Sequence, residues 1–145
     1  MKRFSYLSLL LLVFSLCSVS CSKNDTEKVD YVKQYSSLLY GKWCRENQTE
    51  TSYFFMSYTF PTNSVVTCYQ ESAYKINGKW VVETDETIDG EWFIQYERGL
   101  VGLMIKWHGT DSFRRYNLSH VDTSLLSFSD GYTGDLYKGT ASPKI

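Results

Sequence analysis

Turn-forming segments recur along the chain after residue 60, roughly every 8 to 16 residues. The dipeptide Asn77-Gly78 is the strongest short-range signal for a β-hairpin. The other turn signals are Pro61 to Ser64, Asp89-Gly90, Arg98-Gly99, His108-Gly109, Val121-Asp122-Thr123 and Asp130-Gly131. The segments between them are too short to contain parallel crossovers, so we expect each strand to pair antiparallel with the next. Counting from Trp43, the chain then has about eight or nine strands.

An antiparallel meander of this kind must hide its two edge strands, and closure into a barrel removes both edges. The sequence therefore predicts an all-β protein, an antiparallel up-and-down β-barrel of about eight strands. The composition agrees, because 17% of the residues are aromatic and aromatic side chains favour strands over helices. The 145 residues suffice for one domain with its own core.

Apolar side chains alternate along two of the expected strands, Tyr53 to Phe60 and Glu91 to Glu97. Alternation places one set of side chains on a dry face and the other on a wet face. The barrel interior, and with it a possible ligand site, would then be lined by Phe54, Met56, Tyr58, Phe60, Trp92, Ile94 and Tyr96.

The first twenty residues have the features of a secretory signal peptide. Met1-Lys2-Arg3 is basic, the stretch from Phe4 to Leu16 is apolar, and Ser18-Val19-Ser20 provides small residues at a cleavage site. The apolar run is shorter than the roughly 20 residues that a transmembrane helix needs. We therefore expect residues 1–20 to be removed and the mature chain not to span a membrane.

Cys21 follows the cleavage signal directly, and this stretch resembles a bacterial lipobox, in which the cysteine is acylated and becomes the new N-terminus. The run Ser22-Lys23-Asn24-Asp25 resembles the start of mature lipoproteins of the Bacteroidota. The resemblance implies a palmitate-bearing lipid on Cys21 and a protein anchored at the outer membrane, facing the periplasm or the cell surface. Residues 21–27 would be a tether. The alternative is a secreted protein whose Cys21 carries no lipid.

A helical spacing of apolar residues from Glu27 to Tyr40 predicts a short helix, with an extended lead-in as the alternative. Gly41-Lys42-Trp43 follows, and this motif with the strands down to Lys138 resembles the lipocalin-like domains of Bacteroidota lipoproteins. The resemblance implies that Gly41 turns the chain into the barrel and that the Trp43 indole closes its base. Lipocalins place an Arg over this indole, and here Lys138 can make a cation–π contact instead. We assign residues 28–140 to this domain.

Charges and reactive side chains argue against several functions. With 15 basic against 16 acidic residues, the chain lacks the basic surface that nucleic-acid binding requires. His108 and His120 have no carboxylate or thiol at metal or triad spacing, which predicts structural histidines. Residues 83–91 carry five carboxylates without EF-hand spacing, which predicts a solvated loop rather than a calcium site. We therefore expect no enzymatic activity, no cofactor and no metal.

Cys44 and Cys68 fall on the first and third expected strands. Strands in these positions of a meander are not neighbours, and a disulfide needs Cα atoms within about 4.4 to 6.8 Å. We therefore expect two unpaired, partly buried thiols, although an exported protein could form a disulfide.

Two functions remain. The first is a lipid-anchored binding module of the cell envelope whose barrel interior or mouth takes a small apolar or aromatic ligand. An eight-stranded barrel is just wide enough to hold such a ligand or to be filled by its own side chains. The alternative is a protein-interaction or inhibitor lipoprotein that acts through loops or exposed rings on a filled barrel, with candidates Tyr53, Tyr69, Trp80 and Tyr132. A packed interior without a pocket of about 300 Å³ would favour this second function.

Overall fold

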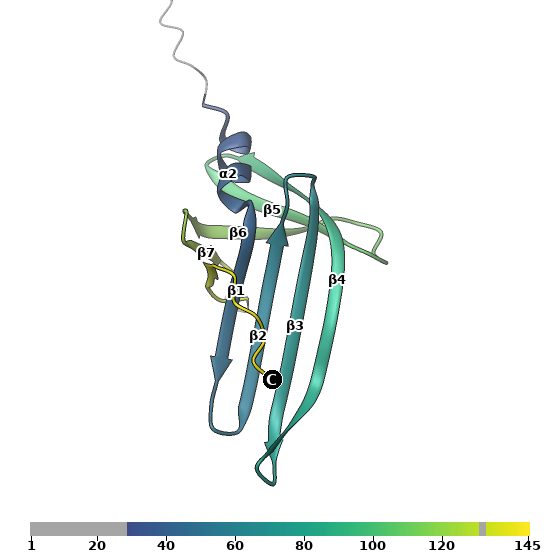
Figure 1. Ribbon diagram of the computed structural model, residues 1–145. Coiled ribbons are helices and arrows are strands. Elements are labelled where there is room, and N and C mark those ends of the chain that lie inside the picture. The colour runs from purple at the N-terminus through teal and green to yellow at the C-terminus, as the bar shows by residue number, and fades with distance from the viewer. Residues whose placement is uncertain (1–28, 131–132) are drawn as a thin grey trace, which may run out of the picture.

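The computed structural model describes residues 29–130 and 133–145 (Figure 1). Within them, one helix precedes eight strands: α2 (Tyr31–Leu39), β1 (Gly41–Gln48), β2 (Ser52–Phe60), β3 (Val65–Ile76), β4 (Lys79–Glu97), β5 (Leu100–Trp107), β6 (Arg114–Val121), β7 (Leu125–Phe128) and β8 (Leu136–Lys138). The expected signal peptide, Cys21, the tether and Tyr132 lie outside the described residues. None of the described helical structure has the length and apolarity to cross a membrane.

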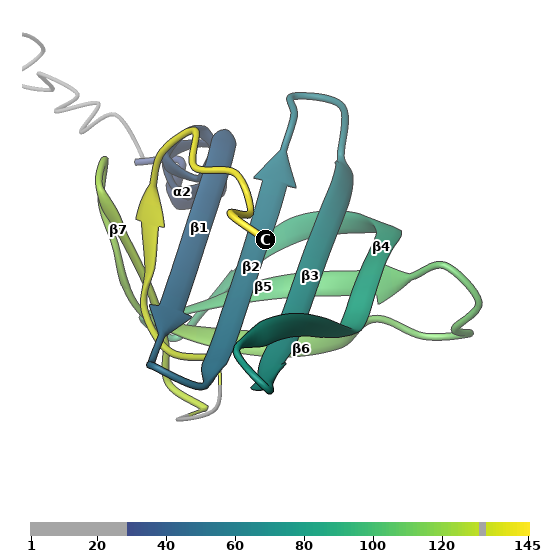
Figure 2. The ribbon, with the colours of Figure 1, turned by 60° about the horizontal axis from the view of Figure 1, so that its bottom comes forward.

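The strands form a closed barrel in which each strand pairs antiparallel with the next and β8 pairs with β1. The closing contact joins Trp43 to Lys138 and Cys44 to Tyr137. Figure 2 shows β5 and β6 crossing the sheet of β1 to β4 at a steep angle. The predicted all-β class, antiparallel up-and-down order and short N-terminal helix are confirmed. The architecture is consistent with a lipocalin-like fold.

Two of the predicted hairpin turns have the geometry that their sequences favour. Asn77 and Gly78 both have positive φ angles, 51° and 79°, and Arg98 and Gly99 have 53° and 81°. Positive φ at both central residues is the type I′ pattern, whose twist matches that of the strands it joins. These turns connect β3 to β4 and β4 to β5.

The predicted turn at Asp89-Gly90 is wrong, because β4 runs unbroken from Lys79 to Glu97. Two expected strands are therefore one, and the barrel has eight strands, which agrees with the predicted count of about eight. Gly90 pairs with Trp107 of β5, and a Cβ atom on Gly90 would come within 2.7 Å of the Lys106 carbonyl oxygen. This glycine permits a close approach of two strands instead of a change in chain direction.

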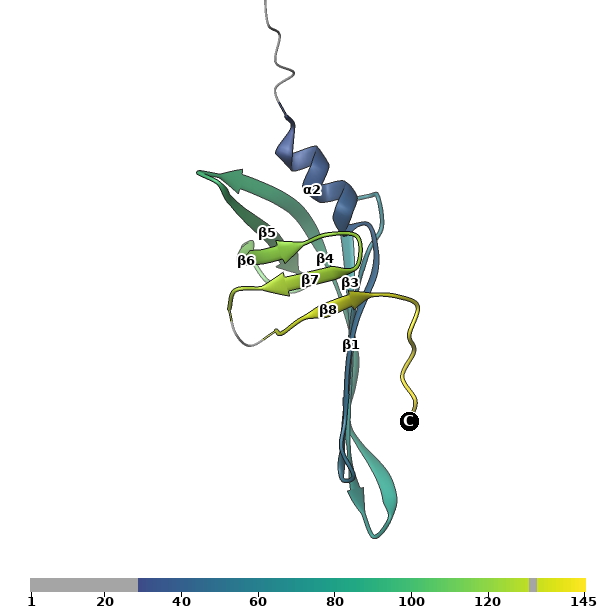
Figure 3. The ribbon, with the colours of Figure 1, turned by 90° about the vertical axis from the view of Figure 1, so that its left-hand side faces the viewer.

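β3 and β4 are longer than the strands that complete the barrel. β5 pairs with residues 90–97 of β4, whereas residues 79–89 pair only with β3 among the described residues. The far ends of the β1–β2 and β3–β4 hairpins therefore project from the barrel (Figures 1 and 3). We call this projecting part, residues 46–55 and 71–86, the extension.

Two apolar clusters lie on opposite faces of the β1–β3 sheet. The interior cluster fills the barrel with Leu39, Trp43, Tyr58, Phe60, Val66, Cys68, Trp92, Ile94, Leu103, Ile105, Leu126, Phe128 and Leu136. The outer cluster is smaller and consists of Cys44, Tyr53, Phe55 and Ala73, with Tyr69 and Trp80 packed against it. Figure 3 shows the C-terminal segment, residues 139–145, on the side of this sheet away from β5 to β8.

Candidate functional site

Most of the residues predicted to line a ligand site pack against one another inside the barrel. Tyr58, Phe60, Trp92 and Ile94 are buried members of the interior cluster, and Met56 is half-buried against it. The ring centres of Phe60 and Trp92 are 5.1 Å apart in an edge-to-face arrangement, and Tyr58 stacks on Phe60 at 6.1 Å. Such contacts stabilise aromatic pairs beyond their burial. The chain's own side chains therefore occupy the interior around these residues.

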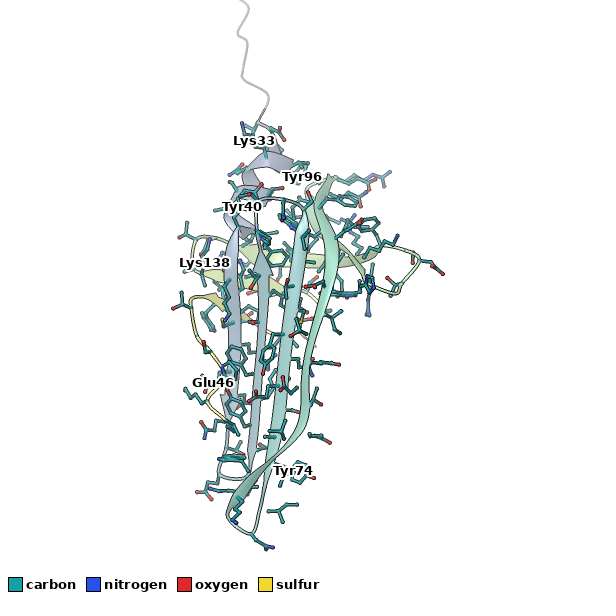
Figure 4. All side chains as sticks on the ribbon, turned by 45° about the vertical axis from the view of Figure 1, so that its right-hand side comes forward. Lys33, Tyr40, Glu46, Tyr74, Tyr96 and Lys138 are labelled. Carbon is teal, nitrogen blue, oxygen red and sulfur yellow. The ribbon has the colours of Figure 1, made fainter. Side chains whose placement is uncertain are left out.

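The other two predicted lining residues lie outside the interior cluster. Tyr96 stands at the mouth, near α2 in Figure 4, where its ring stacks on Tyr31 at 4.4 Å and lies 6.2 Å from Tyr35. Phe54 lies on the extension and pairs with Ser72 of β3. The predicted set thus divides among core, mouth and extension, because β2 and β4 reach beyond the closed part of the barrel.

Gly41 and Trp43 lie where α2 meets β1. Gly41 has a φ of 116°, in the region that favours glycine, and turns the chain from the helix into the strand. The buried Trp43 indole donates its Nε1–H to the Leu39 carbonyl at 2.7 Å. The Lys138 ammonium lies 5.0 Å from the Trp43 ring centre and donates to the Leu38 carbonyl at 3.1 Å (Figure 4). The cation–π contact expected of Lys138 is present, and these bonds hold α2 against the first and last strands.

Tyr53, expected at the surface, is buried because the C-terminal segment covers it. The Lys144 backbone N–H donates to the Tyr53 hydroxyl at 3.0 Å, and the Lys144 ammonium pairs with the Glu46 carboxylate at 2.7 Å. Farther back along the segment, Lys42 donates to the Ala141 carbonyl at 2.7 Å. The C-terminal segment, about ninety residues from Tyr53 in the sequence, thus covers an outer face that was expected to be exposed to solvent. The covered face forms a second, smaller core.

A buried carboxylate lies beside this cover. Glu71 is 4% exposed, and its Oε2 accepts a hydrogen bond from the Tyr69 hydroxyl at 2.6 Å, while Oε1 has no partner among the described residues. This bond, with burial and the nearby Asp85, raises the pKa of Tyr69 well above its ordinary value. Tyr69 and Trp80, both expected at the surface, are half-buried. The Tyr69 hydroxyl therefore partly satisfies an acidic group that packing has taken out of water.

Hollows of ligand size lie on the outside of the barrel. One of about 380 Å³ on the outer face of the sheet is lined by Lys42, Ser57, Thr59, Thr67, Tyr69, Thr87 and Pro143. Another of about 350 Å³ beside β5 is lined by Asp89, Gly90, Glu91, Lys106, Trp107, His108, Gly109 and Thr110. Their walls mix polar and apolar surface in about equal parts, whereas sites for small apolar ligands are mostly apolar. A third hollow of about 170 Å³, at the mouth beside Tyr35, is too small for most ligands.

The extension exposes apolar side chains that neither cluster covers. Tyr74, Ile76, Val81 and Val82 are between 37% and 49% exposed. Tyr74 pairs with Val81, so these two share a face, and Ile76 is on the same face by strand alternation. Figure 4 shows Tyr74 near the end of the extension, far from α2. This is an apolar surface at a distance from the barrel core.

The two remaining cysteines are free and buried, which confirms the expectation of unpaired thiols. They point to opposite faces of the sheet, since Cys44 belongs to the outer cluster and Cys68 to the interior cluster. Burial raises the pKa of Cys68 from 9.0 to about 11. A thiol with so high a pKa stays protonated at neutral pH and is a poor nucleophile.

The two histidines lie at different hollows of the surface. His108 borders the hollow beside β5, and His120 borders the one at the mouth. His120 Nε2 lies 2.9 Å from Asp122 Oδ2, and this bond holds the pKa of Asp122 well below its usual range. The predicted acidic loop, residues 83–91, is instead part of strand β4. Among the described residues, no group of three or more metal-ligating side chains could hold a metal ion.

Comparisons with protein-family models, with curated proteins and with solved structures find no significant match to the chain. The geometry described above therefore carries the functional argument.

The extension is the part of the candidate site that the sequence analysis did not find. Its signal was present in the lengths of the hairpin arms. The arm that precedes Asn77-Gly78 has 12 residues, whereas β5 has 8, so the hairpin is longer than its neighbour can cover. A predicted turn at Asp89-Gly90 obscures this signal, because it divides β4 into two strands of ordinary length.

Proposed function

We propose that this chain is a non-catalytic binding module of the cell envelope that recognises a protein partner on its extension and uses the filled barrel as a rigid support. The observation that carries the proposal is the exposed apolar surface formed by Tyr74, Ile76 and Val81, away from the core. Exposed apolar patches on otherwise polar proteins mark interaction sites. Aromatic residues such as Tyr74 are common among the residues that dominate binding energy.

The filled interior supports a protein partner over a small apolar ligand. A drug-sized ligand needs about 300 Å³ or more of mostly apolar space. Phe60 already packs against both Tyr58 and Trp92 where such a ligand would lie. The hollows of that size lie instead at the surface, and about half of their walls is polar.

The N-terminal sequence supports the envelope part of the proposal. The resemblance of residues 1–25 to a lipoprotein leader implies a lipid on Cys21 and a position at the outer membrane, facing the periplasm or the cell surface. Two or three acyl chains at about 0.8 kcal/mol per buried methylene would anchor the chain stably. The module would then reach its partner from the membrane surface.

Site-specific photocrosslinking in intact cells tests this function. A benzophenone amino acid in place of Tyr74 should give a discrete, heavier adduct with one protein after illumination. The matched control carries the same group in place of Tyr137, which is 61% exposed on β8 of the barrel. Adducts at Tyr74 and none at Tyr137 support the proposal. No adduct at Tyr74, or equal adducts at both positions, would contradict it.

A small ligand inside the barrel is the second candidate function, and one observation favours it. Trp92 is 5% exposed, and its indole Nε1–H has no acceptor among the described residues. An unpaired buried donor costs about 1 to 3 kcal/mol, which a carbonyl group of a ligand could recover. Titration with a panel of aromatic carbonyl compounds, followed by tryptophan fluorescence, tests this candidate. A saturable change that Trp92→Phe abolishes would support it, and no change at millimolar concentration would rule it out.

A further inference from the structure

Residues 79–88 of β4 form an open edge of the sheet. They pair with β3 along their length, from Ile76 opposite Lys79 to Cys68 opposite Ile88. The pairing of β4 with β5 begins only at Gly90, and no described strand lies against the other side of residues 79–88. Figure 1 shows this part of β4 at the border of the extension. An open edge offers unpaired backbone groups to another chain.

The register identifies which backbone groups face outward. The Asp89 carbonyl accepts a hydrogen bond from the His108 N–H at 2.8 Å, so it points to the side that β5 occupies farther along. In a strand, backbone groups alternate sides from one residue to the next. The N–H and C=O groups of Thr87 and Asp85 therefore point to the open edge, while those of Glu86 point toward β3.

The charge of the edge selects among possible occupants. Residues 79–89 carry four carboxylates, on Glu83, Asp85, Glu86 and Asp89, against the single ammonium of Lys79. Pairing with the same edge of a second copy would bring like charges together, which is destabilising across strands. A segment rich in lysine or arginine would instead gain favourable pairs and faster association.

The two faces beside the edge differ in chemistry. Asp85, Thr87 and Asp89 lie on the outer face of the sheet, across from Glu71, Tyr69 and Thr67. The exposed Val81 and Ile88 lie on the other face, opposite Tyr74 and Cys68, and Glu86, opposite Gln70, lies between them on that face. An added strand would therefore place basic side chains on the outer face and apolar side chains on the face that carries the exposed patch.

We propose that the open edge of β4 binds an extended segment of a partner protein in which basic and apolar residues alternate, by adding that segment as a further strand. This inference rests on the proposed function and names the class of partner for the extension together with Thr87 and Ile88, which follow it on β4. Backbone hydrogen bonds from Thr87 and Asp85 supply affinity, and the carboxylates with Val81 and Ile88 supply specificity.

Thr87→Pro tests the backbone contribution. Proline removes the outward N–H of Thr87 and leaves the bonds of Glu86 to β3 in place, because proline is tolerated on edge strands where its nitrogen faces outward. Thr87→Ala is the matched control, since it removes the same side chain and keeps the N–H. The probe is a short fluorescent peptide in which lysine and valine alternate, and binding is measured by anisotropy. We expect Thr87→Pro to bind about tenfold or more weakly than Thr87→Ala, with both variants melting as folded proteins.

Charge reversal tests the specificity without touching the backbone. The double variant Glu83→Lys with Asp85→Lys should weaken binding of the lysine–valine peptide and strengthen binding of a glutamate–valine peptide. Binding of the lysine–valine peptide to the wild type should also weaken as salt is raised. Three results would overturn strand addition. The first is equal binding of the lysine–valine peptide to Thr87→Pro and Thr87→Ala, and the second is no binding of this peptide to the wild type at millimolar concentration. The third is a charge-reversed variant that does not exchange its preference between the two peptides.

The same Thr87→Pro change in the cell separates this inference from the proposed function. Photocrosslinked adducts at Tyr74 that disappear in Thr87→Pro and persist in Thr87→Ala support strand addition. Adducts that persist in both variants overturn strand addition and leave the proposed function standing. If the chain with the original Thr87 gives no adducts at Tyr74, both the proposed function and strand addition are overturned.

Discussion

Replacing Tyr69 by phenylalanine removes the donor that the structure gives to the buried carboxylate of Glu71. The two oxygens are 2.6 Å apart and Glu71 is 4% exposed, so water cannot readily take the place of the hydroxyl. A hydrogen bond to a charged group contributes about 1.5 to 3 kcal/mol, and the second carboxylate oxygen already lacks a partner. We expect Tyr69→Phe to lower the free energy of unfolding by about 2 to 3 kcal/mol at neutral pH. In a domain of this size, the melting temperature should fall by about 8 to 12 °C.

A double-mutant cycle with Glu71→Leu isolates this interaction. Urea unfolding gives the free energy of the wild type, of each single variant and of the double variant. Because the double variant has no buried charge left to satisfy, it should be more stable than Tyr69→Phe, with a coupling energy of about 1 kcal/mol or more. A Tyr69→Phe loss below about 0.5 kcal/mol, or additive effects of the two changes, would refute the assignment of Tyr69 as the partner of a buried charge.

Three further changes test other parts of the molecule. The folded pKa of Cys68, about 11, lies above the unfolded value of 9.0. The stability that the buried thiol contributes is therefore fully present below pH 9 and is lost as the pH rises to 11. The free energy of unfolding of the wild type, measured in urea, should therefore fall by about 2 to 3 kcal/mol more across this window than that of Cys68→Ala. Equal losses would contradict the burial of the thiol. Gly90→Ala should destabilise the protein by about 2 kcal/mol or more in thermal melts, since its Cβ would meet the Lys106 carbonyl at 2.7 Å. Gly139→Ala, with open space around it, should stay within about 0.5 kcal/mol of the wild-type stability. Cys21→Ala should release the protein to the soluble fraction, and a wild-type N-terminal peptide without acyl mass would show that the lipid prediction fails.

The fold could be predicted from the sequence where the signal is local. Asn77-Gly78 and Arg98-Gly99 form the tight turns that their residues favour, because the φ angles they require depend on those two residues alone. Asp89-Gly90 has the same appearance in the sequence and lies inside β4. Glycine suits both turns and close contacts between strands. Only the pairing of Gly90 with Trp107 of β5 shows that this glycine has the second role.

The candidate site could be predicted only in part. Alternation placed Tyr58, Phe60, Trp92 and Ile94 correctly on the interior face, and all four are buried there. The same alternation placed Phe54 with them, although it lies on the extension. The extension was not predicted because its existence depends on how far β5 reaches along β4, which is a matter of pairing between strands and not of either strand alone.

The strand order, the antiparallel pairing and the side chains that share a face could be predicted from the sequence, since turn chemistry and the two-residue period of a strand act over a few residues. What covers each face depends on contacts between distant parts of the chain. The C-terminal segment buries Tyr53 from about ninety residues away, while Tyr74 stays exposed on the extension. Periodicity reports the direction in which a side chain points, whereas burial depends on which distant segment arrives in front of it. The open edge of β4 has the same origin, because strands β5 to β8 close the barrel before they reach it.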